Sequence, residues 1–289
     1  KGNDIVRILP RTNDQINEEW LTDKARYSFD SVSKNRLDIP LMKTNKFQEI
    51  SWEEVFGQLH KNLVSNNSLS NPTIRLKLGS LVDLETITAC ENISRVLKQK
   101  VNVVSYKKSD NVNINLDHTL NYRATDINNK LAEADLLLLV NLDLKNEIPL
   151  FNARLSNSIR KSGVPVGVLG SNIDCSFNYE HIGFDLKDFI TLLEGNNKFL
   201  NKILQAKSPL ILFGENCSTW NLNSFYPYLS KINTNVNFSI LNHNVAVAGL
   251  GEYGYNTNSK NGSNTNENFF IDIWYFKFVL NVFIKTIRF

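Results

Sequence analysis

Short, continuously apolar runs alternate with amphipathic stretches along most of the chain. The runs have the length of strands and cover residues 74–78, 136–140, 164–169 and 210–213. A small-residue turn follows each of them except the second, which polar residues follow. Strands that are apolar at every position are typical of a parallel sheet covered on both faces, and alternation with helices indicates βαβ units. The pattern predicts an α/β fold: a doubly wound, mostly parallel, Rossmann-like sheet with right-handed crossovers.

The amphipathic stretches predict four helices, one beginning at residue 51 and the others covering residues 84–97, 151–160 and 225–232. Ser51 and Glu54 fit an S-x-x-E capping box, in which each side chain binds the other residue's backbone N–H. Asp83 stands at the N-cap position of the second helix, where a carboxylate accepts hydrogen bonds from the first turn.

The two ends of the chain differ from this alternating middle. Residues 1–50 are polar and irregular, residues 51–256 form the predicted Rossmann-like domain, and residues 257–268 are a low-complexity polar linker. Such a linker contains too little apolar surface to order itself.

Residues 269–289 form an apolar, aromatic tail whose length approaches the roughly 20 residues of a membrane span. Charged and polar residues interrupt it, namely Asp272, Lys277, Asn281, Lys285 and Arg288. Since a charge at mid-span costs about 2.5–3.5 kcal/mol, we expect no membrane span. We expect instead a strand or helix packed at an intra- or intermolecular interface, because such a segment aggregates when exposed.

Composition excludes several classes of protein. The chain has 289 residues, a net charge of +3 and 42% hydrophobic residues, which is typical of a folded domain and leaves no basic patch for nucleic acid. Its three cysteines, Cys90, Cys175 and Cys217, lie far apart and are expected to be free thiols. No C-x-x-C spacing is present, so no iron–sulfur or zinc site is expected from this chain alone. The four histidines are isolated and are expected to be ordinary surface or core residues; they are His60, His118, His181 and His243.

A glycine motif at residues 249–254 reads G-x-G-x-x-G, with glycines at Gly249, Gly251 and Gly254. In a dinucleotide site these glycines allow a tight turn between a strand and a helix, and the helix N-terminus binds the pyrophosphate. A polar linker follows here instead of a helix, so a plain glycine turn is expected.

A second candidate is a crevice at the strand ends. Gly170-Ser171 and Gly214 follow predicted strands, where open α/β sheets bind ligands, and Asp174 and Glu215 lie nearby in the sequence. Ordinary loop polarity is the favoured explanation of these residues, and a vestigial crevice is the alternative. No G-x-S-x-G elbow or P-loop occurs, and we assign no catalytic, cofactor-binding or metal-binding residue.

Several blocks resemble the largest iron–sulfur subunit of respiratory complex I (the 75 kDa, Nad11 or NuoG type). They are ILPR at 8–11, INEEWLTDKARY at 16–27, SWEE at 51–54, GSLVD at 79–83 and EIPLFNAR at 147–154. Weaker, collinear similarity continues to about residue 256. The resemblance is to the C-terminal, molybdopterin-oxidoreductase-like domain of that subunit, without its N-terminal iron–sulfur portion.

The resemblance implies a scaffold with no catalytic role of its own, on the matrix side of the mitochondrial inner membrane, within NADH:ubiquinone reductase (H⁺-translocating). It implies no cofactor in this chain, with the iron–sulfur clusters and FMN held by partner subunits. Molybdenum enzymes of this superfamily bind the metal after the first βα unit, but residues 106–122 contain Ser109, with Ser105 just before, and no cysteine. The implied partners are the iron–sulfur portion of the same subunit, on this or a separate polypeptide, and other peripheral-arm subunits.

Two other classes of function stay open. One is a stand-alone molybdopterin- or nicotinamide-dependent oxidoreductase, which bound cofactor in the purified protein would reveal. The other is a small-molecule binding module using the strand ends, which a monomer without partners would favour.

Overall fold

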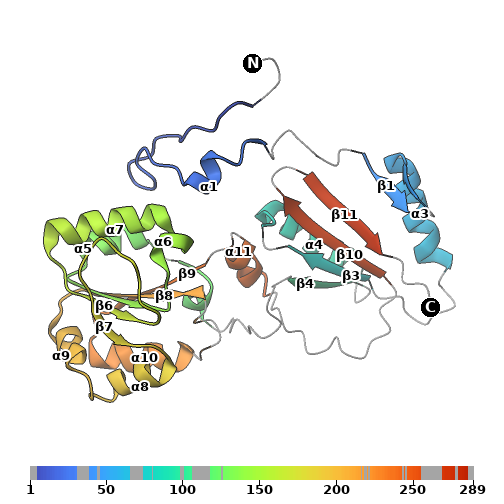
Figure 1. Cartoon of the computed structure of the whole chain (residues 1–289). Helices are drawn as coiled ribbons and strands as arrows, with labels where there is room; N and C mark the ends of the chain where they lie inside the picture. The colour runs from blue at the N-terminus through green and yellow to red at the C-terminus, as the bar shows by residue number, and fades with distance from the viewer. Residues whose placement is uncertain are drawn as a thin grey trace. The chain divides into compact units, whose positions relative to one another are not determined.

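The computed structural model describes most of the chain (Figure 1). The described residues are 5–30, 39–43, 46–65, 74–79, 81–97, 101–105, 118–124, 126–215, 217, 220, 222–242, 244, 246–254, 269–276 and 279–285. Their contacts divide the chain into two compact units. Unit 1 comprises Lys1–Ile8, Tyr27–Asp110 and Thr257–Phe289, and unit 2 comprises Leu9–Arg26 and Asn111–Asn256.

Unit 2 is built on a five-stranded sheet in which every neighbouring pair is parallel. Its order is β7-β6-β5-β8-β9, with bounds Glu180–Gly183, Val166–Leu169, Leu136–Val140, Pro209–Gly214 and Asn237–Leu241. The predicted α/β fold is confirmed, and the strand predicted over residues 136–140 has the predicted bounds.

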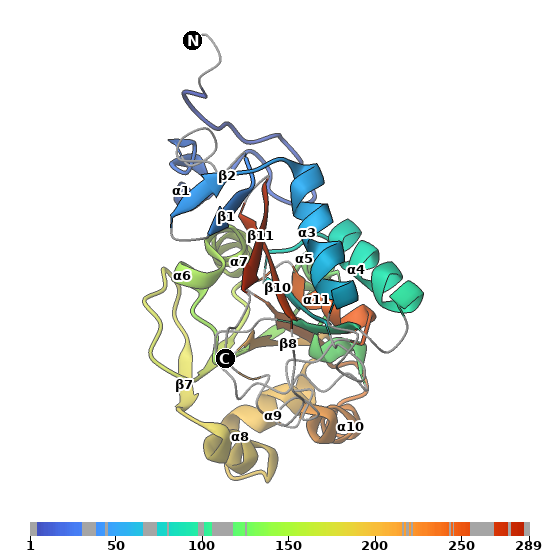
Figure 2. The same cartoon turned by 90° about the vertical axis from the view of Figure 1, so that its right-hand side faces the viewer.

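Helices cover both faces of this sheet, and the central strand β5 is therefore buried at every position. Leu136 and Leu138 face one core, which includes Phe213 and is closed by α8 (Leu186–Leu193), α9 (Lys198–Gln205) and α10 (Leu222–Ile232). Leu137 and Leu139 face the other, closed by α5 (Ile127–Glu133), α6 (Leu144–Glu147) and α7 (Pro149–Ser162). Figures 1 and 2 show α7 and the α8–α10 group on opposite sides of the sheet.

Local sequence signals explain where these helices begin and end. Asp185 forms a reciprocal capping box with Asp188 at the start of α8. Pro149 opens α7, and Gly163 ends it at φ +65°, a conformation that favours glycine. Unit 2 also contains η2 (Thr119–Asn121), α11 (Ala246–Glu252) and α1 (Asp23–Arg26).

Unit 1 contains a four-stranded sheet of order β11-β10-β3-β4. Its strands are Val279–Lys285, Phe269–Phe276, Ile74–Leu78 and Val101–Ser105 in that order. β10 pairs in parallel with β3 and antiparallel with β11, and β3 pairs in parallel with β4. A hairpin of β1 (Leu41–Lys43) and β2 (Phe47–Glu49) completes the described strands of this unit.

The helices of unit 1 begin where the sequence predicts. The backbone N–H of Ser51 donates to Glu54 Oε2 (2.8 Å), and that of Glu54 donates to Ser51 Oγ (3.2 Å), at the start of α3 (Trp52–Ser65). Thr86 N–H donates to Asp83 Oδ1 (2.8 Å) at the start of α4 (Leu84–Leu97). Both predicted caps are confirmed.

The aromatic tail provides β10 and β11, so in the structure it is part of a sheet with β3. Among the described residues, no helix has the length and apolar character needed to cross a membrane. The predicted linker at 257–268 lies outside the described residues. The boundaries 1–50, 51–256, 257–268 and 269–289 stay predictions, and the two contact-based units cut across them.

Candidate functional site

The carboxyl ends of β5 and β8 form the position where an open α/β sheet binds ligands. The chain runs from β5 to β6 and β7 on one side, then returns to β8 on the other side of β5. This reversal is a topological switch point, and the loops that leave the two strands diverge there. The predicted crevice residues Gly170 and Gly214 lie at this edge of the sheet.

Backbone packing of Asn141 fills the space between these two glycines. Asn141 follows β5 at φ +48°, and its N–H donates to the Leu169 carbonyl (2.7 Å). A Cβ on Gly170, which has φ +130°, would lie 2.7 Å from Asn141 Oδ1, and a Cβ on Gly214 would overlap the Asn141 carbonyl oxygen. The two glycines therefore allow their loops to pack closely against Asn141, and this packing explains them without a ligand.

The first helix after β5 has a carboxylate at its N-terminus. Asp143 Oδ1 accepts hydrogen bonds from the N–H groups of Lys145 and Asn146 (both 3.2 Å), and Asn146 Nδ2 donates to Asp143 Oδ2 (2.7 Å). The Asn146 side-chain hydrogen bond, aided by backbone hydrogen bonds, lowers the pKa of Asp143. A helix N-terminus at this position can hold a phosphate. Here its donors are taken, and a phosphate would meet a negative charge.

The two carboxylates predicted near the crevice, Asp174 and Glu215, are respectively ion-paired and buried, and Cys217 is buried nearby in the sequence. Asp174 forms an exposed ion pair with Lys145 (2.6 Å), which lowers the pKa of Asp174. Glu215 is buried. Cys217 is buried with Sγ 3.4 Å from the Val140 carbonyl oxygen, and burial raises its pKa to about 12. Because a thiolate is the reactive and metal-binding form, Cys217 is an inert core thiol at neutral pH.

The glycine motif lies mostly on a helix. Gly249 and Gly251 are inside α11, and Gly254 follows it at φ +74°. The expected plain turn is therefore wrong for the first two glycines. A Cβ on Gly251 would overlap the Tyr122 ring, so this glycine allows α11 to pack closely. In a dinucleotide site the glycines lie in the turn between strand and helix, whereas here Gly249 and Gly251 lie within the helix that follows β9. That the motif binds no cofactor stays a prediction.

The described histidines and the other two cysteines are hydrogen-bonded, exposed or at least partly buried, and they form no common site at the carboxyl ends of β5 and β8. His118 Nδ1 accepts from the Leu120 N–H (3.2 Å), His181 Nε2 lies 2.9 Å from the Gly170 carbonyl oxygen, and His60 is exposed on α3. Burial raises the pKa of Cys90 to about 11 and also raises that of Cys175. His243 and Ser109 lie outside the described residues. Within the described part of the chain, no three His, Cys, Asp or Glu side chains form a metal-binding group.

Sequence reasoning missed a contact between two separately recognised blocks. Residues 13–18 form a closed turn, in which the Asn13 carbonyl accepts the N–H groups of Ile16 (3.1 Å), Asn17 (3.0 Å) and Glu18 (2.7 Å). Glu18 has φ +53°, and its carbonyl accepts the Asn13 N–H (2.9 Å). The carbonyls of Asp14, Gln15 and Ile16 can therefore accept hydrogen bonds from groups outside the turn.

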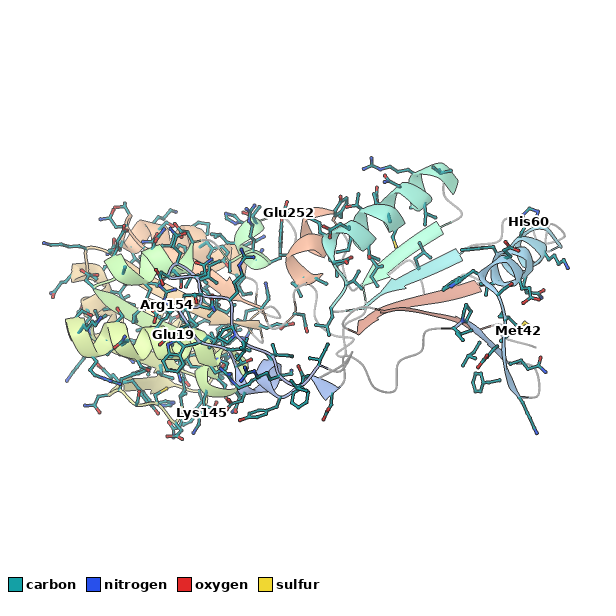
Figure 3. The ribbon with its side chains drawn as sticks, turned by 90° about the horizontal axis from the view of Figure 1, so that it is seen from above. Glu19, Met42, His60, Lys145, Arg154 and Glu252 are labelled. Atoms are coloured by element: carbon teal, nitrogen blue, oxygen red, sulfur yellow. The ribbon has the colours of Figure 1, made fainter. Side chains whose placement is uncertain are left out.

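Arg154 on α7, which is labelled in Figure 3, donates hydrogen bonds to these carbonyls. Its Nη1 donates to the carbonyls of Gln15 (2.7 Å) and Ile16 (2.9 Å), and its Nη2 donates to that of Asp14 (3.3 Å). Asn128 Nδ2 on α5 donates to the Gln15 carbonyl as well (2.8 Å). The N-terminal segment is thus fastened to the α5–α7 side of unit 2. We refer to residues 13–18 as the Arg154-held turn.

Comparison with known families places these features in context. Residues 36–286 match the family described as molybdopterin oxidoreductase. The chain belongs to the molybdopterin oxidoreductase family. Residues 1–30 match the family described as the NADH-ubiquinone oxidoreductase NDSU1/NuoG-like 4Fe-4S domain.

Individual relatives carry names from one enzyme complex. The NADH-ubiquinone oxidoreductase 75 kDa subunit of Reclinomonas americana is 31% identical over 225 residues, covering 74% of this chain and 32% of that protein. The mitochondrial 78 kDa subunit of Neurospora crassa is 30% identical, covering 80% of this chain and 31% of that protein. The 75 kDa subunit of Dictyostelium discoideum is 32% identical, with 76% and 33% covered. The resemblance to the largest complex I subunit is confirmed, and the chain spans about a third of these relatives' length.

The match of residues 1–30 corrects one expectation. The sequence blocks implied that the iron–sulfur portion is wholly missing, yet this segment is similar to part of the 4Fe-4S domain family. The segment contains no cysteine, so it has none of the thiolate ligands that such clusters use.

The described residues do not fit the cofactor that the family name suggests. Molybdopterin carries a phosphate, and the helix N-terminus beside the switch point is occupied by the Asp143 carboxylate. The thiol at this edge, Cys217, is protonated at neutral pH and hydrogen-bonded within the core.

Proposed function

We propose that the chain is a non-catalytic scaffold in the peripheral arm of mitochondrial complex I, on the matrix side of the inner membrane. The names of its relatives support this assignment. Electrons would pass through iron–sulfur clusters and FMN in partner subunits or in the iron–sulfur portion of the same subunit. The role of this chain would be to hold that portion in place.

The observation that carries the proposal is the filled switch point. Asn141 packs against Gly170 and Gly214, and Asp143 takes the helix donors that a phosphate would use. These contacts support a fold retained for packing without its cofactor. They argue against the alternative of a molybdopterin- or nicotinamide-dependent oxidoreductase.

A native gel of detergent-solubilised mitochondrial membranes, stained for NADH oxidation, tests the assignment. We expect peptide mass spectrometry to find this chain in the large NADH-oxidising band. Migration at its own mass would contradict the proposal and favour a free-standing binding module.

A second measurement tests the non-catalytic part. The purified chain is analysed for molybdenum and tungsten by elemental mass spectrometry, for pterin by fluorescence after oxidation, and for nicotinamide dinucleotides by mass spectrometry of the denatured protein. We expect substoichiometric amounts of all of them. A stoichiometric cofactor would refute the scaffold role even if the chain co-migrates with the complex.

A further inference from the structure

Helix α3 of unit 1 has an aromatic face that is open to solvent. Among residues 52–58 only Val55 is buried, so the helix packs by that side. Trp52 is 49% exposed and Phe56 is 61% exposed, and their rings stack at 6.0 Å, one turn apart. His60, one turn beyond Phe56, is also exposed (Figure 3). Because an amphipathic helix ordinarily turns large aromatic side chains toward a core, this face is typical of a surface that binds a partner.

The residues beside the aromatic pair leave room for a side chain of a partner. Glu53 and Gly57 are exposed and lie one turn apart, in the row next to Trp52 and Phe56. Open space surrounds the position that a side chain of Gly57 would occupy. A long side chain of a partner can therefore lie over Gly57, next to the aromatic rings, and reach the Glu53 carboxylate at the start of the helix.

Negative charge accompanies the Trp52 end of this face. Glu49, the last residue of β2, and Glu53 stand on either side of Trp52 in the sequence, and both are exposed. Neither carboxylate has an ion-pair partner in the described part of the chain. Lys61 follows Gly57 by one turn, so positive charge lies toward the other end of the helix. An indole face next to carboxylates is a combination that attracts a cation.

This charge decides among the possible occupants. A symmetric pair of α3 helices from two copies would bring the same carboxylates together, and like charges that face each other oppose association. A membrane surface that contains anionic lipids repels these carboxylates as well. A basic segment of another protein meets neither obstacle. Arginine suits the face better than lysine, because a planar guanidinium can stack on an indole and still donate to a carboxylate.

We infer that the aromatic face of α3, formed by Trp52, Phe56 and Gly57 with Glu49 and Glu53 at one end, docks an arginine-bearing segment of a neighbouring protein. The inference rests on the proposed scaffold function and adds a surface through which the chain contacts another subunit. In this arrangement the arginine stacks on the Trp52 ring, and its guanidinium donates to the carboxylates beside it.

Binding of peptides to the purified full chain tests the chemistry of this face. The probes are an arginine-rich peptide and its lysine counterpart of the same length. The readout is the fluorine NMR resonance of fluorotryptophan at position 52, which the variant Trp52→Phe assigns. We expect the arginine peptide to shift this resonance and to bind about threefold more tightly than the lysine peptide, because a guanidinium stacks better on the ring. Equal binding of the two peptides, or no shift with either, would overturn the inference.

Two carboxylate variants test the role of charge with the same readout. Glu53→Gln keeps the shape of the side chain and removes its charge, so the affinity for the arginine peptide should fall about threefold. The matched control is Glu85→Gln, which should leave the affinity unchanged. Glu85 is likewise the second residue of its helix, α4, and follows an exposed apolar side chain that is not aromatic, Leu84 (54% exposed). An equal loss in both variants would mean that the peptide responds to overall charge only, which contradicts the docking surface.

Site-specific photocrosslinking in mitochondria identifies the occupant. The full chain carries p-benzoylphenylalanine in place of Phe56, and the control carries it in place of Val96, which is 78% exposed on α4. We expect position 56 to crosslink to an arginine-containing peptide of another protein, and position 96 not to give this product. Crosslinks from position 56 to a second copy, to lipid or to a segment without basic residues would overturn the inference. The same products from both positions, or none from position 56, would overturn it too.

Failure of this surface and failure of the proposed function are distinguishable, because the peptide measurements need no assembled complex. If the arginine peptide does not bind and the chain still co-migrates with the NADH-oxidising complex, only the docking surface is wrong. If the peptide binds at Trp52 and the chain does not co-migrate, the scaffold function in complex I fails, and the arginine-binding face belongs to a different assembly.

Discussion

The two units build similar parallel strands from very different stretches of chain. The sheet of unit 2 uses one continuous stretch, from β5 to β9. The sheet of unit 1 joins β3 and β4 to β10, whose first residue, Phe269, pairs with Ile74 roughly 200 residues earlier. Ordering a pair so far apart costs more chain entropy than ordering a closer pair, so the sheet of unit 1 depends on more distant strand pairings than the sheet of unit 2.

Deleting residues 269–289 should produce the largest difference in stability between the two units. β3 would lose its β10 neighbour, and half of the four-stranded sheet would be absent. We expect backbone amides of β3 and β4 to exchange hydrogen much faster, while those of β5 and β8 keep their protection, because the unit 2 sheet contains no tail strand. Hydrogen-exchange mass spectrometry measures both sheets in one sample. Equal loss of protection in both sheets would show that the units do not fold independently.

Phe213→Ala should destabilise unit 2 and leave unit 1 unchanged, the opposite of the tail deletion. Phe213 is fully buried, and its ring lies 6.1 Å from that of Phe189 in an edge-to-face arrangement. Removing a buried phenylalanine side chain costs about 3–5 kcal/mol. The unfolding free energy of unit 2 should fall by that amount in urea titrations, with hydrogen exchange in β3 unchanged.

The control for this prediction is Leu204→Ala, which changes an exposed side chain and should shift stability by less than about 0.5 kcal/mol. If the two variants had the same effect, the buried aromatic core would not be the source of unit 2 stability.

Strands and helix caps of both units could be predicted from the sequence, because each depends on residues that are close together in the chain. Strand β5 is a continuous apolar run, whereas β3 alternates apolar residues with Arg75 and Lys77. The bounds of both strands agree with the prediction. The caps by Ser51 and Asp83 depend only on neighbouring residues, so their side chains alone determine them.

Distant contacts could not be predicted in this way. Pairing of β10 with β3 is set by a register between segments that no local pattern connects. Gly249 and Gly251 sit in a helix despite a cost of about 1 kcal/mol each, since α11 buries Ala246, Val247 and Leu250. The Arg154 contact joins residues 139 positions apart and uses backbone carbonyls, which leave no mark in the sequence.

The two units also differ in the space around two glycines, Gly214 in unit 2 and Gly57 in unit 1. Gly214→Ala places a Cβ against the Asn141 carbonyl oxygen and should destabilise unit 2 by about 1–3 kcal/mol. Gly57→Ala in α3 of unit 1 is the matched change, because open space surrounds that position. It should stabilise the helix by about 0.5–1 kcal/mol, since alanine loses less backbone entropy than glycine. Thermal unfolding measures both, and destabilisation by both would contradict the packing argument.

A modest effect is expected at the helix caps, where the two units are alike. Asp143→Ala in unit 2 and Asp83→Ala in unit 1 each remove a carboxylate that accepts backbone N–H groups, at a cost of about 1 kcal/mol. The pKa of Asp143 is held below its usual 3.8, chiefly by the Asn146 side chain.

A depressed pKa gives Asp143 a specific pH dependence. Its ionised form stabilises the folded state at any pH above the pKa of the unfolded chain, about 3.9, and this contribution is lost as pH falls through the lower folded pKa. The difference in urea stability between Asp143→Ala and the unaltered chain should therefore be constant from pH 7 to pH 5 and shrink below pH 4. A difference that does not shrink at all below pH 4 would mean that the cap acts through packing or neutral hydrogen bonds and not through the negative charge of Asp143.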